Sequence, residues 1–152
     1  MEKEIDILLV EDNEHEARLA IMGLESRNLA DRVFHVEDGE EALEFIFANG
    51  RYDTRHGQRN PKLILLDLKL PKVNGLEVLR EIKTNARTKS IPIVLLTSSQ
   101  EDRDVVMGYE LGVNSYIVKS INFSAFCKDI VDVALYWTVL NLLPAQQETL
   151  SL

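Results

Sequence analysis

Four short apolar stretches of the sequence each lead into side chains suited to phosphate or metal chemistry. The side chains are, in chain order, Glu11 and Asp12, Asp67, Thr97, and Lys119. Carboxylates crowded into one site repel one another and need a cation, and oxygen ligands without His or Cys suit Mg²⁺. A metal, a hydroxyl and an ammonium together stabilise a transferring phosphoryl group, which a carboxylate can accept. The set therefore predicts phosphoryl transfer, with Asp67 as the nucleophile.

These side chains come together only if the apolar stretches are parallel strands of one sheet. Leu63–Leu66 is apolar throughout, which is typical of a strand buried on both faces. Helical patterns alternate with the stretches and predict an α/β fold, a doubly wound five-stranded parallel sheet in the flavodoxin-like order 2-1-3-4-5. All strands then end at one edge, where such sheets bind ligands. Taken alone, Asp67 has a simpler alternative role, which is to cap the helix that follows it.

The pattern also sets approximate boundaries for the elements. The expected strands are Ile5–Val10, Val33–Val36, Leu63–Leu66, Ile91–Leu96 and Ser115–Val118. The expected helices are Glu14–Leu29, one after Gly39, one after Gly75, Glu101–Leu111 and Phe123–Leu140. In the last helix, core spacing is expected for Phe123, Phe126, Cys127, Ile130 and Ala134.

Bulk properties exclude several classes of function. The 152 residues suit one domain, and the net charge of −8 disfavours DNA or RNA as a direct partner. No apolar run is long enough to span a membrane. Cys127 is the only cysteine, which indicates a reducing cytoplasm, and the histidines show no metal-ligand spacing.

The ordered set Glu11 and Asp12, Asp67, Thr97 and Lys119 resembles the receiver domain of two-component response regulators. The resemblance extends from Ile5 to about Val139 and implies the receiver fold. It implies that Asp67 accepts a phosphoryl group from the phosphohistidine of a sensor histidine kinase. The chain would then be a phosphoacceptor switch, not an enzyme, capable only of self-phosphorylation and slow phosphoaspartate hydrolysis.

The same resemblance assigns roles around Asp67. Mg²⁺ would be held by Asp12, Asp67 and the backbone carbonyl of Lys69, with assistance from Glu11. Lys119 and Thr97 would bind phosphoryl oxygens. Tyr116 matches the switch aromatic of the family, which turns inward when Thr97 is drawn toward the phosphate.

Two departures from the family matter. Lys69 and Ser99 occupy two positions that in the family govern how easily water reaches the phosphoaspartate. Receivers usually carry Pro after the lysine that Lys119 matches, and Ser120 stands there. This second departure leaves another reading open, a receiver-like interaction module that works without phosphate. A nucleotide hydrolase is excluded, because no Gly-rich loop ending in Gly-Lys-Ser/Thr exists in the sequence.

A long basic insertion and the lack of an output segment narrow the resemblance. Ala48–Pro61 exceeds the usual helix-to-strand connection and contains Arg51, Arg55 and Arg59. It is expected to be either a solvated loop or a docking surface for an acidic partner. The insertion and the absence of an output segment together resemble the small regulators of phytochrome-type histidine kinases. The resemblance implies a stand-alone regulator. It would act by protein contact or by phosphorelay to a downstream phosphotransfer protein.

The C-terminal segment is apolar on nearly every side from Ala134 onward. A helix that is apolar all round is buried all round, so a second copy of the chain is expected to cover it. We divide the chain into a receiver domain, 1–140, and a C-terminal extension, 141–152, that acts as a dimerisation arm. The residues expected to bury in the homodimer are Trp137, Val139, Leu140, Leu142 and Leu143. The alternative is a tail that folds back on its own domain.

Overall fold

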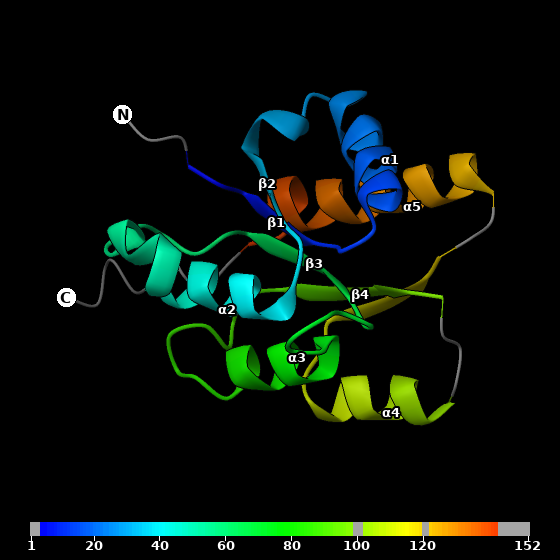
Figure 1. The fold of residues 1–152 in the computed structure, drawn as a ribbon. Helices are drawn as coiled ribbons and strands as arrows, with labels where there is room; N and C mark the ends of the chain where they lie inside the picture. Colours follow the sequence, from blue (N-terminus) through cyan, green and yellow to red (C-terminus); the bar gives the residue numbers. More distant parts are fainter. Residues whose placement is uncertain (1–3, 99–101, 120–121, 143–152) are drawn as a thin grey trace.

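The computed structural model describes residues 4–98, 102–119 and 122–142 of the chain. In this part, a single parallel sheet lies between two layers of helices (Figure 1). Its strands are β1 (Ile7–Val10), β2 (Val33–Val36), β3 (Leu63–Asp67), β4 (Ile93–Thr97) and β5 (Ser115–Val118). The strand order is β2-β1-β3-β4-β5, and all neighbouring pairs are parallel. The predicted doubly wound, flavodoxin-like architecture is confirmed.

Helices cover both faces of the sheet. One face carries α1 (Glu14–Glu25) beside α5 (Phe123–Leu135), and the opposite face carries α2 (Gly39–Phe47), α3 (Gly75–Lys83) and α4 (Asp102–Glu110) (Figure 1). Shorter turns are η1 (Ala30–Arg32), η2 (Gly50–Arg55) and a π-helical turn, η3 (Tyr136–Leu140). Among the described helices, none combines the length and the apolar character that a membrane span requires.

Polar side chains start four of the helices. α1, α2, α3 and α5 each begin after an Asn or Asp whose side-chain oxygen accepts a backbone N–H of the first turn, a donor without a partner inside the helix. The capping residues are Asn13, Asp38, Asn74 and Asn122. The caps fix the helix N-termini at the edge of the sheet where the strands end.

The central strands are buried on both faces. On β3, Ile64 and Leu66 pack into the core beneath α2, α3 and α4, whereas Leu63 and Leu65 pack beneath α1 and α5. Every residue of β1, β3 and β4 is buried, while most residues of the edge strands β2 and β5 are half-buried. The burial of β3 explains its continuous apolar run and fixes the backbone of Asp67 at its end.

Three helix ends differ from the predicted boundaries, and the smallest difference is at α4, which ends at Glu110 instead of Leu111. α1 ends at Glu25 instead of Leu29, because Asn28 adopts the left-handed conformation (φ +59°) and the Leu29 amide bonds back into the last turn. The last α-helix ends at Leu135, and the segment continues to Leu140 as the π-helical turn.

The core positions of α5 are mostly those expected. Phe126, Ile130 and Ala134 are buried, whereas Cys127 is only partly buried, its Sγ 3.4 Å from the Leu19 carbonyl oxygen of α1. Phe123 is 55% exposed, and its ring lies edge-on to His15 of α1, so its predicted core role is wrong. The helical spacing was correct, but Phe123 is the first residue of the helix and packs beside a neighbouring surface side chain instead of into the core.

The basic insertion is ordered and largely self-paired. The Tyr52 ring packs edge-on against Phe34 and Phe45, with ring centroids 5.8 Å and 5.3 Å away. The Arg55 guanidinium stacks over Phe45, 3.6 Å from the ring centroid. Arg51 and Arg59 form ion pairs with acidic side chains of the same chain, including Glu44 and Asp6. Most of the segment is exposed, as expected of a solvated loop, but its arginines contact groups of the same chain. Its role as a docking surface stays a prediction.

We expect the insertion to contribute to stability through Tyr52. Tyr52→Ala removes the ring that bridges Phe34 and Phe45 and should lower the free energy of unfolding by about 1–3 kcal/mol. Chemical denaturation measures the change. Thr54→Ala, on the same turn at an exposed position, is the control and should stay within about 0.5 kcal/mol. Equal effects would mean that the ring cluster adds nothing.

Candidate functional site

Three carboxylates gather where β1 and β3 end. Glu11 and Asp12 follow β1 directly, and Asp67 is the last residue of β3. One oxygen from each carboxylate lies within 4.8 Å of those of the other two. Glu11 and Asp67 are buried, whereas Asp12 is exposed. The crowding predicted from the strand order is therefore present.

Burial disturbs the ionisation of this cluster. Burial raises the pKa of Glu11 to about 8, against the opposing effect of Lys119. Burial also raises the pKa of Asp67, although Lys119 and a hydrogen bond from the backbone of Lys69 oppose the rise. Because the two carboxyls interact closely, they titrate as a pair, and burial disfavours the charge of both.

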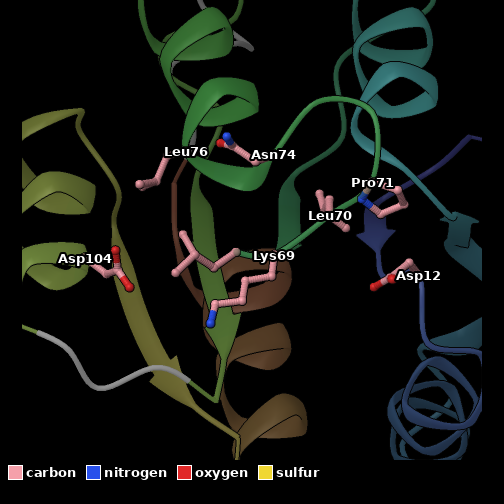
Figure 2. A pocket seen from close by; sticks show the side chains of 8 residues that line it. Asp12, Lys69, Leu70, Pro71, Asn74, Leu76 and Asp104 are labelled. Carbon is pink, nitrogen blue, oxygen red and sulfur yellow. The ribbon is translucent and has the colours of Figure 1, made fainter.

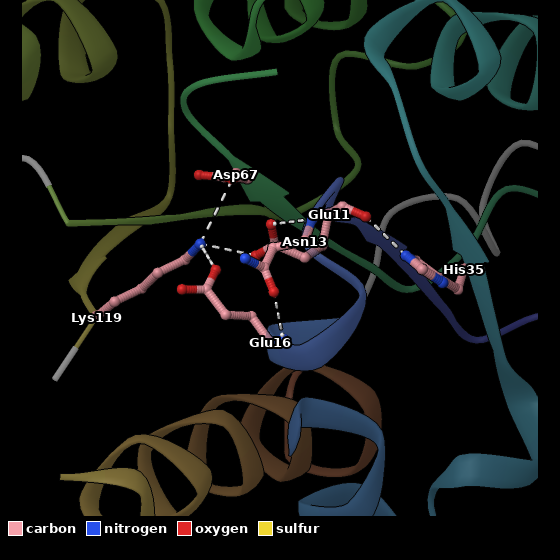
Figure 3. Close-up of polar contacts among 6 residues, drawn as sticks. All are labelled: Glu11, Asn13, Glu16, His35, Asp67 and Lys119. Atoms are coloured by element: carbon pink, nitrogen blue, oxygen red, sulfur yellow. Dashed lines mark hydrogen bonds and ion pairs between the residues drawn. The ribbon is translucent and has the colours of Figure 1, made fainter. Parts of the chain in front are cut away.

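Lys119 brings a positive charge into the cluster from the end of β5. Its Nζ lies 2.7 Å from Glu11 Oε1, 2.5 Å from Glu16 Oε2 and 3.4 Å from Asp67 Oδ2 (Figure 3). Burial lowers the pKa of Lys119, but its bonds to Glu11 and Glu16 outweigh that effect and raise the pKa above its ordinary value. Lys119 is therefore a cation, and its own amide, bonded to the Thr97 carbonyl at 2.7 Å, fixes its backbone.

The remaining predicted residues lie on β4, β5 and the loop after β3. Thr97 is the last residue of β4 and is 1% exposed. Tyr116 lies half-buried on β5 and packs against the core beneath α2, α3 and α4. The side chain of Lys69 is exposed. Ser99 lies outside the described residues, as does Ser120, whose place the family usually gives to Pro.

Three polar residues of the site were missed by sequence reasoning. Asn13 caps α1 by accepting the Glu16 amide at 2.9 Å. His35 of β2 places Nε2 2.7 Å from the Glu11 carbonyl oxygen (Figure 3). Asn13 and Glu16 were detectable, because Asn-x-x-Glu before an apolar helix resembles a capping box. His35 had no such signal, since its contact depends on the register between β1 and β2.

A cavity of about 600 Å³ borders the cluster at Asp12. Figure 2 shows Asp12 and Asp104 on opposite sides of this space, with Lys69 between them. Among the described residues, the cavity is lined by Asp12, Leu68, Lys69, Leu70, Pro71, Asn74, Leu76 and Asp104. The cavity gives solvent and small molecules access to the metal side of the cluster.

The donor set fits Mg²⁺. Glu11, Asp12 and Asp67 offer closely spaced carboxylate oxygens without a nitrogen or sulfur ligand among them, which suits a hard cation that keeps several waters. The raised pKa values of Glu11 and Asp67 fit as well, because a divalent ion would offset the negative charge that burial disfavours.

We expect Mg²⁺ affinity to rise with pH. The pKa of Glu11 is raised from 4.5 to about 8, so below pH 8 the ion must displace a proton, whereas above pH 8 it need not. Affinity should therefore increase by up to about tenfold per pH unit between pH 6 and 8 and then level off. Calorimetric titration at several pH values measures the slope. Glu11→Gln should bind more weakly and with a flatter profile; an unchanged slope would contradict the assignment.

Comparisons with known proteins agree with this geometry. The family model described as response regulator receiver domain matches residues 7–131. The chain is 40% identical to the response regulator Rcp1 of Synechocystis over 139 residues, 91% of this chain and 92% of that one. The crystal structure of the phosphorylated cyanobacterial phytochrome response regulator RcpA is similar with a TM-score of 0.84 and 38% identity, over 93% of this chain and 99% of that chain. The Mn²⁺-bound form of Rcp1 is similar with a TM-score of 0.83 and 39% identity, over the same shares of the chains.

Proposed function

Because the chain belongs to the family of response regulator receiver domains, we propose that it is a phosphorylation switch in which Asp67 accepts a phosphoryl group from the phosphohistidine of a sensor histidine kinase. The observation that carries the proposal is the surroundings of Asp67. Its carboxylate lies at the end of the central strand, 3.4 Å from the Lys119 ammonium and within the carboxylate cluster that fits Mg²⁺. A nucleophile, a cation and a metal site thus meet at one point.

The proposed transfer uses groups of this site, the phosphoryl donor, a Mg²⁺ ion and a proton from solvent. An oxygen of Asp67 attacks phosphorus, the O–P bond forms and the P–N bond to the donor imidazole breaks. The bonding pair stays on the imidazole nitrogen, which takes a proton from solvent. Lys119 and the Thr97 hydroxyl would donate to phosphoryl oxygens. Asp12, Glu11, Asp67 and the Lys69 carbonyl would hold Mg²⁺, which would supply positive charge against the growing negative charge.

The same contacts supply a switch. A phosphoryl group adds about −1.5 to −2 charge and three acceptor oxygens. Drawing Thr97 toward these oxygens opens space for the Tyr116 ring to turn inward, which alters the surface around β5. The protein would take phosphate from small donors such as acetyl phosphate and hydrolyse its phosphoaspartate slowly. Its signal would pass in the cytoplasm by protein contact or to a downstream phosphotransfer protein.

The partner we propose is a histidine kinase of the phytochrome type. The similarity to a phytochrome response regulator supports this choice. The test is to mix the chain with a phytochrome-type kinase that has been autophosphorylated with labelled ATP. Transfer of label to the wild type and not to Asp67→Asn is expected. Label accepted from acetyl phosphate but from no kinase of this type would contradict the partner and leave the switch intact.

The phosphate-independent module is the less favoured function. It would require the acceptor, metal and phosphate-binding positions to serve no purpose, although Glu11, Asp12, Asp67, Thr97 and Lys119 are all present.

We also propose that the arm at 141–152, with the last turn of receiver domain 1–140, forms a homodimer. Val139, Leu140 and Leu142 are 64%, 75% and 80% exposed, an apolar row that a second copy would bury. Trp137 packs in part against the core of its own domain. Leu143 lies outside the described residues.

The dimer is expected to depend on this row. Leu140→Glu together with Leu142→Glu places two charges where the partner would pack and should convert the protein to monomer, as measured by light scattering after size exclusion. Val106→Glu, at a 56% exposed position of α4, is the control and should leave the mass unchanged. A dimer that survives the double change would rule out this interface.

A further inference from the structure

The first turn of α1 carries a carboxylate that contacts the lysine of the phosphate site. Glu16 Oε2 lies 2.5 Å from Lys119 Nζ, the shortest of the three carboxylate contacts of this ammonium (Figure 3). The Glu16 side chain is partly exposed, whereas that of Lys119 is largely buried. A residue from a solvent-facing helix end therefore reaches into the cluster.

The local role expected of Glu16 is taken by another residue. In a capping box, the Glu three positions after the cap bonds back to the backbone N–H of the cap. Here the Asn13 N–H donates to Glu11 Oε2 at 3.2 Å. Glu16 keeps only the other half of the box, its amide bonded to the Asn13 side chain. Its carboxylate is thus released from the helix and turned toward Lys119.

The distances place the ammonium nearer to α1 than to the acceptor. An ammonium has three donors. The contacts to Glu16 and Glu11, at 2.5 Å and 2.7 Å, are hydrogen bonds, whereas the 3.4 Å contact to Asp67 is longer than a good one. Lys119 is therefore held mainly by residues that do not accept the phosphoryl group.

We propose that Glu16 is a positioning residue that retains Lys119 beside α1 in the unphosphorylated chain and so limits how readily the acceptor site takes up a phosphoryl group. The inference rests on the proposed function and deepens it. An arriving phosphoryl group needs the donors of Lys119, and the Glu16 carboxylate competes for those donors. The negative charge of Glu16 would also repel the oxygens of a phosphoryl group on Asp67, because Lys119 contacts both side chains.

Beryllofluoride, which mimics a phosphoryl group on an aspartate, provides the test. With saturating Mg²⁺, Glu16→Gln is expected to bind beryllofluoride about two- to fivefold more tightly than the wild type, the range for a partly exposed ion pair. Glu14→Gln is the matched control. It removes the same charge from the same turn of α1 at an exposed position, and its affinity should equal that of the wild type.

The outcomes separate this inference from the function on which it rests. A variant that merely damaged the site would bind less tightly, so a gain is not the result of a structural role. Weaker binding by Glu16→Gln, or equal affinities of Glu16→Gln and Glu14→Gln, would overturn the inference while wild-type binding upholds the switch. If the wild type itself shows no Mg²⁺-dependent binding, both the switch and the role of Glu16 are overturned.

Discussion

Asp67→Asn is expected to abolish phosphorylation. With acetyl phosphate and Mg²⁺, the wild type should gain one phosphoryl adduct in its intact mass, and the variant should gain none. The physical reason is that a neutral amide oxygen is a poor nucleophile and cannot yield a stable acyl phosphate. Loss of one carboxylate from the cluster also weakens the metal site that the transfer uses.

The variant should remain folded, which makes the loss interpretable. Burial disfavours the charge of Asp67, so a neutral side chain of nearly equal size should leave the melting temperature unchanged or higher. Asp104→Asn, which changes a carboxylate that lines the cavity on the α4 side, is the matched control and should still be phosphorylated. An adduct of equal yield on Asp67→Asn would move the acceptor to another residue, which peptide mapping would locate.

Gly75→Ala is expected to have a large effect on the scaffold of the site. A methyl group at this position would lie 2.3 Å from the Asp67 carbonyl oxygen and 2.7 Å from Leu68 Cα, both of them backbone atoms. The start of α3 would have to move away from the end of β3. We expect a loss of about 1–3 kcal/mol or more in the free energy of unfolding, measured by denaturation, and slower phosphorylation, because the acceptor shifts with its strand.

Gly23→Ala is the control for the added methyl group. Gly23 lies inside α1, and its new methyl would lie 3.3 Å from Cys127 Cβ and 3.4 Å from the Cys127 carbonyl oxygen, which a shift of a few tenths of an ångström between α1 and α5 would relieve. Replacing a helical Gly by Ala also favours the helix by about 0.5–1 kcal/mol. The net change should be small, and a loss as large as that of Gly75→Ala would show that any added methyl destabilises the fold.

The sheet and most of the candidate site were predictable, because both follow from local patterns and chain topology. A buried parallel strand must be apolar at each position, so β3 and β4 could be recognised directly from the sequence. Parallel strands end at one edge, so the approach of Asp67, Glu11 and Lys119 followed from their positions after strands. The bond from Glu16 to Lys119 was not predictable, because it depends on which way two long side chains turn.

Other differences come from contacts between distant segments. The insertion reads as a polar, basic loop, yet Tyr52 packs on rings of β2 and α2, and Arg59 pairs with Asp6 ahead of β1. The sequence of the insertion alone does not indicate that its side chains contact these residues of distant segments. The end of α1 depends on the left-handed conformation of Asn28, which a helix does not contain. The apolar Leu29 fits the helical spacing, so the sequence pattern alone extends the helix too far.

The π-helical turn η3, which follows α5, also determines the direction in which the next residues point relative to the domain. The Asn141 amide donates to the Tyr136 carbonyl oxygen, five positions earlier, at 2.7 Å, so this turn holds about one residue more than an α-helical turn. In an α-helix each residue advances the chain by about 100°. Deleting one residue between 136 and 140 should therefore rotate Leu142 by about that angle relative to the domain. A change of one codon in length could thus redirect the arm in evolution or design, while every residue around Asp67 stays the same.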